Sequence, residues 1–244
     1  MQGRDLLLGI LRTLYYKFYL RVRWLPSFNP IMGIYGVKIG EVEISFNDPP
    51  FYDIEYGLLD YINNLSPNNS HCFVDAGSFI GTEAIYFAKL SPQNYVVALE
   101  PDPNNYKKLV TNIALNKLSN VLCINAGLWN SLKGIKFAPN KGEMSSISFT
   151  NDRKSIHIKT VTLDSLYQRT GRKIDYVKMD IEGAEIEALQ GGLRCIRKCH
   201  PKFIIASYHI RNGRQTRDRV ERILKKHYSH VESKQTKQLV TIAY

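Results

Sequence analysis

The 244-residue sequence has no long uncharged apolar run and only four cysteines. A membrane-spanning helix needs about 20 largely uncharged residues, whereas the apolar stretch at residues 5–25 contains four Lys or Arg side chains. The first residues also show no cleavable signal-peptide pattern. These absences exclude a spanning helix over residues 5–25 and a disulfide-rich secreted domain, and they predict a reduced, cytoplasmic protein.

The cysteines also lack the spacing of a zinc site. Cys195, Cys199 and His200 lie close together, but no second ligand pair follows at finger-like spacing. We therefore expect no bound metal and interpret the cysteines as buried or surface thiols. With 44% apolar and 11% aromatic residues, and no internal repeat, the chain can bury one α/β core.

Acidic residues are scarce in the last part of the chain. Residues 191–244 contain 13 Lys or Arg and 3 Asp or Glu, whereas residues 1–190 contain 20 Lys or Arg and 19 Asp or Glu. The net charge of the whole chain is +11. The run at residues 211–228 predicts a basic helix that suits anionic partners such as phosphorylated sugars, lipid head groups or RNA. The alternative interpretation is a solvated helix face.

Residues 73–81, FVDAGSFIG, are the most informative segment. They predict a strand that runs into two spaced glycines, followed by a helix at 82–90 and a second strand at 95–100 that ends on an acid. A glycine lets the backbone approach a ligand closely, and the acid Glu100 can accept both hydroxyls of a ribose. This order predicts a site for an adenosine-containing cofactor.

The glycine spacing separates two classes of cofactor. A dinucleotide fold prefers GxGxxG, but here the middle glycine is missing and the bulky Phe79 stands in its place. Pyrophosphate would fit poorly, whereas S-adenosylmethionine (AdoMet) carries no phosphate. The unit resembles class I AdoMet-dependent methyltransferases, which implies a Rossmann-like α/β fold: a mostly parallel seven-stranded sheet, helices on both faces and a C-terminal antiparallel hairpin.

A second segment narrows the resemblance. Residues 175–192, DYVKMDIEGAEIEALQGG, predict a strand that ends on Asp180 and a helix that opens with acids. Together with FVDAGSFIG, LEPDP, NIALN and INAGLWN, the segment resembles the FkbM family of methyltransferases over roughly residues 50–210. That family methylates hydroxyl oxygens, mostly on sugars and small metabolites. The chain departs from the family at Phe79, where Asn is usual, and at Ser207, where Glu commonly precedes the histidine matched to His209.

The carboxyl ends of parallel strands meet at one edge of the sheet, so distant residues are expected in one crevice. For catalysis we expect Asp180 to position the acceptor hydroxyl, neutral His209 to take its proton, and Glu182 to assist. The alternatives are helix-dipole acids and a structural histidine. The expected cofactor contacts are Asp75, Gly77, Ser78, Phe79, Gly81, Glu100, Asn125, Gly127 and Glu55.

Glu55 comes from the resemblance, which implies that the aromatic, acidic segment around it closes over the cofactor. Its alternative role is an exposed acid at a helix N-terminus. Asn125 or Gly127 is expected near the adenine, although a plain turn would explain both.

Residues 5–25 predict an amphipathic helix, which either packs on the catalytic domain or a dimer partner, or lies peripherally on an anionic membrane. Residues 33–47 predict a hairpin. The expected organisation is an N-terminal helix at 1–30, a hairpin and cap segment at 31–70, and a catalytic domain at 71–244.

The leading hypothesis is an AdoMet-dependent O-methyltransferase that acts on a sugar, glycan or related small hydroxyl acceptor. A second hypothesis is an RNA methyltransferase, favoured by the basic C-terminal part and by LVTNIALNKL. Against it, the fourth strand ends in DIEGAE and not in the NPP-type tetrapeptide used for methylating base nitrogens. A third hypothesis is a noncatalytic AdoMet-binding protein that associates with membranes.

Overall fold

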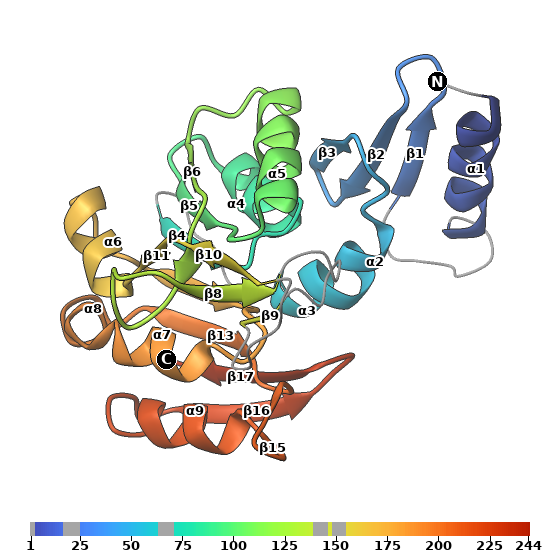
Figure 1. Cartoon of the computed structure of the whole chain (residues 1–244). Helices are drawn as coiled ribbons and strands as arrows, with labels where there is room; N and C mark the ends of the chain where they lie inside the picture. The colour runs from blue at the N-terminus through green and yellow to red at the C-terminus, as the bar shows by residue number, and fades with distance from the viewer. Residues whose placement is uncertain (1–2, 17–24, 63–70, 139–145, 148–154) are drawn as a thin grey trace.

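The computed structural model describes residues 3–16, 25–62, 71–138, 146–147 and 155–244 (Figure 1). Its centre is a seven-stranded sheet with the order β16-β17-β13-β12-β4-β5-β6. The parallel strands are β13 (Lys202–Ala206), β12 (Tyr176–Met179), β4 (Cys72–Ala76), β5 (Tyr95–Leu99) and β6 (Val121–Ile124). The antiparallel strands are β16 (Val231–Gln235) and β17 (Leu239–Ala243). The predicted mostly parallel sheet and terminal hairpin are confirmed.

The strands are short apolar runs because both faces of the sheet are covered. In β4, Phe73 contributes to one hydrophobic cluster, while Val74 points into the cluster on the other face. The first cluster lies under α4 (Thr82–Leu90) and α5 (Pro103–Leu115). The second lies under α6 (Leu163–Thr170), α7 (Glu185–Gln190), α8 (Leu193–Cys199) and α9 (Arg217–Leu224).

The N-terminal part forms a second, three-stranded antiparallel sheet of β1 (Leu25–Asn29), β2 (Ile34–Ile39) and β3 (Val42–Phe46) (Figure 1). The predicted hairpin at 33–47 is confirmed, but β1 is an addition, since we expected a helix as far as residue 25 and no strand directly after it. The predicted helix at 5–25 is described as α1 (Gly3–Leu14), and residues 17–24 lie outside the described part. Gly9 lets α1 pack on β1, because a Cβ there would lie 2.5 Å from the Phe28 ring.

Two asparagines of the NIALN motif join this N-terminal sheet to the core. Asn116 Oδ1 accepts the backbone N–H of Ser45 at 3.0 Å, and its Nδ2 donates to the Ser45 carbonyl at 2.7 Å. Asn112 Oδ1 accepts the backbone N–H of Asn47, while its Nδ2 donates to the carbonyl of Ile80. These hydrogen bonds give both asparagines of the motif a structural role.

A helical segment at residues 51–62 connects the two sheets. It consists of α2 (Phe51–Asp53), a wider π turn, η2 (Ile54–Leu58), and α3 (Leu59–Ile62). Its buried side chains Phe51, Ile54, Leu58 and Tyr61 join the cluster under α4 and α5. π turns inside helices are frequent at functional sites, and this one borders the cavity described below.

The basic run at residues 211–228 is not one helix, contrary to expectation. It begins as a small hairpin of β14 (Ile210–Arg211) and β15 (Arg214–Gln215), and α9 starts only at Arg217. The turn residues Asn212 and Gly213 have φ of 51° and 75°. Such Asn-Gly pairs favour a tight hairpin turn over a continuous helix.

Between the third and fourth parallel strands in chain order, the chain forms short extra strands. They are β7 (Gly127–Leu128), β8 (Ile135–Ala138), β9 (Ser146–Ile147), β10 (Ile156–Ile158) and β11 (Thr160–Val161). Residues 139–145 and 148–154 of this region lie outside the described residues. Across the described parts of the chain, every helix is too short or too polar to cross a bilayer.

Candidate functional site

A cavity of about 610 Å³ opens at the carboxyl ends of the parallel strands. Its wall includes parts of the 51–62 segment, the glycine loop after β4 and the short strands β8 and β10. The predicted residues that line it are Gly77, Phe79, Glu100, Gly127, Asp180, Glu182 and His209. The predicted residues outside the lining are Asp75, Ser78, Gly81, Asn125 and Glu55.

Gly77 lies where the glycine loop touches the end of β12. Its φ is 78°, and a Cβ there would stand 1.9 Å from the carbonyl oxygen of Asp180. Ser78 turns away from the cavity, since its hydroxyl donates to the Asp75 carbonyl at 2.9 Å. Gly81 precedes α4 with φ of 94°, and a Cβ there would meet Leu109 at 2.6 Å. The glycines therefore permit close packing around the cavity.

Phe79 and Glu100 form the next part of the wall. Phe79 has φ of 48°, a left-handed conformation that Asn tolerates better than Phe. The Asn that the resemblance led us to expect here would adopt this conformation at a lower cost. The Phe79 N–H donates to Glu100 Oε2 at 2.9 Å, and the Asp102 N–H donates to Oε1 at 2.9 Å. The backbone thus fixes the carboxylate at the cavity wall.

Burial raises the pKa of Glu100 to about 7, and the two backbone N–H donors oppose this rise. Asn125 supports the same strand end, because its Nδ2 donates to the Glu100 carbonyl at 2.8 Å. Asn125 therefore holds the backbone beside the cavity, while Gly127 reaches the lining.

Lys178 is a lining residue that the sequence interpretation missed. Its Nζ lies 3.2 Å from Asp75 Oδ1 and donates to the Gly77 carbonyl at 2.8 Å. Burial opposes its charge, but the carboxylates of Asp75, Glu83 and Asp180 hold its pKa above the usual value. A lysine in the otherwise apolar strand YVKM was the available signal. Asp75 is buried beneath the cavity as the partner of this ammonium group.

Glu83 also lines the cavity at the start of α4, and it too was missed. Burial raises its pKa to about 7, although the Lys178 charge opposes this rise. Glu55 instead forms an ion pair with Lys237 in the turn between β16 and β17. That pair ties the 51–62 segment to the terminal hairpin.

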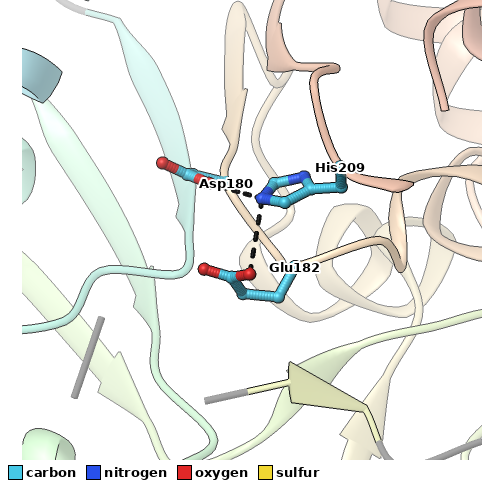
Figure 2. Close-up of side chains that lie close together, drawn as sticks. All are labelled: Asp180, Glu182 and His209. Carbon is cyan, nitrogen blue, oxygen red and sulfur yellow. Dashed lines mark ion pairs between the residues drawn. The ribbon is translucent and has the colours of Figure 1, made fainter. Parts of the chain in front are cut away.

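Asp180, Glu182 and His209 come together on one side of the cavity (Figure 2). His209 Nε2 lies 3.5 Å from Asp180 Oδ1 and 3.5 Å from Glu182 Oε2. Tyr61 donates its hydroxyl proton to Asp180 Oδ2 at 3.3 Å. Glu182 turns toward the cavity through a left-handed backbone with φ of 55°, an uncommon conformation for a residue with a side chain.

Glu185, a further residue that we missed, lies on the other side of the imidazole. Its Oε1 lies 2.9 Å from His209 Nδ1, and its side chain is fully buried. Ser207, where the family has Glu, instead lies 2.8 Å from the Thr241 hydroxyl inside the sheet. A carboxylate beside His209 is therefore present, but it comes from the third acid of DIEGAE.

The charge state of His209 differs from the neutral imidazole that we expected. Burial alone would lower its pKa. The hydrogen bond and the charge of Glu185, with the charges of Asp180 and Glu182, raise the pKa to about 9. His209 therefore carries a positive charge near neutral pH, because the three surrounding carboxylates stabilise the protonated imidazole.

Comparison with known proteins identifies the family to which this chain is similar and the fold that it shares. The sequence profile of the family described as "Methyltransferase FkbM domain" matches residues 75–232. A hexuronic acid methyltransferase, AglP, of Haloferax volcanii is 31% identical over 137 residues, which cover 55% of this chain and 54% of the relative. The chain therefore matches about half the length of this relative.

Two solved structures share the fold. Methyltransferase FkbM from Methylobacillus flagellatus KT has a TM-score of 0.58 at 22% identity, covering 81% of this chain and 51% of that one. The fibrillarin of Aeropyrum pernix has a TM-score of 0.50 at 11% identity, covering 91% of this chain and 98% of that one.

Proposed function

Because this chain belongs to the FkbM methyltransferase family, we propose that it transfers the methyl group of AdoMet to a hydroxyl oxygen of a sugar, glycan or related small metabolite. One observation carries this proposal. A buried acid at the end of β5, Glu100, shares one cavity with the cluster of Asp180, Glu182 and His209. Glu100 suits a ribose, and the cluster suits a reacting hydroxyl.

AdoMet fits the Glu100 side of the cavity on chemical grounds. Each Glu100 oxygen accepts one backbone N–H, and a carboxylate oxygen has a further lone pair for a ribose hydroxyl. Lys178 uses two of its three donors on Asp75 and Gly77, which leaves one for the carboxylate of the methionine part. The structure of the Aeropyrum pernix fibrillarin contains bound AdoMet.

The reaction needs an acceptor oxygen in line with the methyl–sulfur bond, at roughly 3–3.5 Å from the methyl carbon. An oxygen lone pair forms the new O–CH3 bond, the methyl–sulfur electron pair passes to sulfur, and the hydroxyl proton leaves. Asp180, Glu182 and His209 are placed to hold that hydroxyl. A sugar acceptor is supported by the name of the Haloferax volcanii relative, a hexuronic acid methyltransferase.

A screen with methyl-labelled AdoMet tests this function. The purified chain is incubated with uronic acids and other sugars, glycans, small hydroxy metabolites and RNA, and labelled products are separated. We expect label on a hydroxyl oxygen of a sugar or small metabolite. Binding of AdoMet without transfer to any acceptor would favour the noncatalytic hypothesis, and preferential binding of NAD would contradict the AdoMet site.

An RNA acceptor remains the second candidate because 13 Lys or Arg against 3 acids occupy residues 191–244. Part of this charge is already paired: Arg211 lies 2.6 Å from Glu187, and Lys225 lies 2.6 Å from Glu221. If RNA is the acceptor, the parent should bind RNA at moderate salt, and neutralising Arg214, Arg217 and Arg222 should weaken that binding. Binding to liposomes alone would favour a lipid partner.

We also propose that α1 makes peripheral contact with an anionic membrane, in a protein otherwise located in the cytoplasm. Its apolar side chains are exposed, with Leu7 at 57% and Leu11 at 52% accessible. Arg12 in the last turn supplies a cation next to them. A Leu7→Glu, Leu11→Glu variant should lose sedimentation with anionic vesicles while it keeps AdoMet affinity.

A further inference from the structure

Three potential metal ligands converge in the cluster of Asp180, Glu182 and His209. Each contributes one ligand atom, and these atoms all lie within 4.8 Å of one another. The residues belong to two separate chain segments, the turn after β12 and the residues after β13 (Figure 2). All three line the cavity, so an ion held there would face a bound acceptor.

The distances suit a shared ion better than direct hydrogen bonds. His209 Nε2 lies 3.5 Å from each carboxylate, which is long for an N–H···O bond. Two ligand atoms that are each about 2.1 Å from one ion, at angles of about 90–110°, are separated by roughly 3.0–3.4 Å. The two separations that involve His209 are close to that range.

His209 gives an independent indication that a ligand belongs here. Its side chain is 7% exposed, yet Nε2 makes no hydrogen bond to any described residue. Asp180 Oδ1 is likewise buried without a hydrogen bond from the described part of the chain. Figure 2 shows the imidazole nitrogen directed at the two carboxylates. The ion pair between His209 Nε2 and Asp180 Oδ1, at 3.5 Å, is longer than a hydrogen bond, and an ion bound between them would satisfy both.

Glu185 supplies the support that metal-binding histidines usually have. Such a histidine donates its other ring N–H to a carboxylate or carbonyl, which fixes the ring and its tautomer. Glu185 Oε1 lies 2.9 Å from His209 Nδ1 and also accepts the Gly183 N–H at 3.1 Å. Nε2, on the other side of the ring, faces the cluster, and a bound cation would take the place of its proton.

From this geometry we propose that Asp180, Glu182 and His209 bind one divalent cation of the type that takes mixed oxygen and nitrogen ligands, such as Mn²⁺ or Zn²⁺. Cysteine spacing had led us to expect no metal, but this site uses no cysteine. The role in catalysis rests on the proposed function. The ion coordinates the acceptor oxygen and lowers the pKa of its hydroxyl, whose proton passes to solvent water. The oxygen then attacks the methyl carbon, and the methyl–sulfur electron pair remains on sulfur.

Binding of Mn²⁺ to the full chain, after treatment with a chelator and desalting, tests the site directly. Electron paramagnetic resonance of free Mn²⁺ should show about one bound ion per chain. Glu182→Gln removes a partly exposed ligand with little risk to folding and should weaken binding at least tenfold. Glu187→Gln is the matched control, because it removes a nearby charge that pairs with Arg211 and lies outside the cluster.

Glu185→Gln keeps the shape and one acceptor oxygen, and we expect its Mn²⁺ affinity to fall by about tenfold or more. Absence of stoichiometric binding in the parent, or equal binding in Glu182→Gln and the parent, would overturn the site.

Methyl transfer distinguishes this inference from the proposed function. An unchanged transfer rate in chelator-treated protein would overturn the ion's catalytic role and leave the proposed function standing. Specific Mn²⁺ binding without transfer to any hydroxyl would uphold the site and defeat the proposed function.

Discussion

The two sides of the cavity satisfy their carboxylates in different ways. On the proposed cofactor side, both Glu100 oxygens accept backbone N–H groups at 2.9 Å. On the proposed acceptor side, Asp180 Oδ1 and His209 Nε2 are buried without hydrogen bonds from the described residues. The first side is preorganised by its own backbone, whereas on the second side Asp180 Oδ1 and His209 Nε2 meet only in an ion pair at 3.5 Å. Function on the second side should therefore be the more sensitive to substitution.

Asp180→Asn should produce the largest effect, because it removes a charge from the acceptor side and leaves Glu100 and its backbone donors unchanged. We expect the single-turnover rate of methyl transfer to fall by a factor of about 10² to 10⁴, while AdoMet affinity changes by less than about twofold. Calorimetry and rapid quench measure the two quantities separately. Near-parental rates in both Asp180→Asn and His209→Ala would contradict the assignment of these residues to the acceptor hydroxyl.

Glu100→Ala should affect the other side and weaken AdoMet binding by at least about tenfold. Loss of a charge-assisted hydrogen-bonded pair costs about 1.5–3 kcal/mol. Calorimetric titration of AdoMet measures the effect, and Asp180→Asn is the control in the same cavity. Unchanged affinity in Glu100→Ala would mean that the ribose lies elsewhere.

Gly77→Ala should disturb the contact between the two sides. The added Cβ would stand 1.9 Å from the Asp180 carbonyl oxygen at φ of 78°, so the free energy of unfolding should fall by about 3 kcal/mol. Gly171→Ala is the control, since its φ is 61° and nothing lies within 4 Å; the left-handed conformation alone should cost about 1 kcal/mol. Urea denaturation measures both, and equal losses would contradict the close approach.

The smallest expected effect is a pH dependence of AdoMet binding. Burial raises the pKa of Glu100 to about 7, and ribose hydroxyls donate more strongly to the ionised carboxylate. Affinity should therefore rise several-fold as the pH increases from 6 to 8. Glu100→Gln should abolish this rise, whereas Glu83→Gln, at the second carboxyl with a pKa of about 7, should retain it. If the increase in AdoMet affinity with pH persists in Glu100→Gln, then a group other than Glu100 causes it.

The sequence predicted the sheet well because its strands are short apolar runs between recognisable helices. It also placed Glu100, Asp180 and His209 correctly at strand ends, since the parallel order brings those ends together. Glu185 was missed because its partner lies 24 positions away, and helix-opening acids ordinarily serve the helix dipole. The Asn212–Gly213 turn was a local signal for a hairpin, and the charge of the surrounding run obscured it.

The structure of the chain with bound S-adenosylhomocysteine tests the division of the cavity most directly. We predict that the ribose hydroxyls lie within hydrogen-bonding distance of the Glu100 carboxylate. The sulfur should face the cluster of Asp180, Glu182 and His209, with room between them for an acceptor oxygen. A ribose bound away from Glu100, or a sulfur directed away from the cluster, would contradict the account.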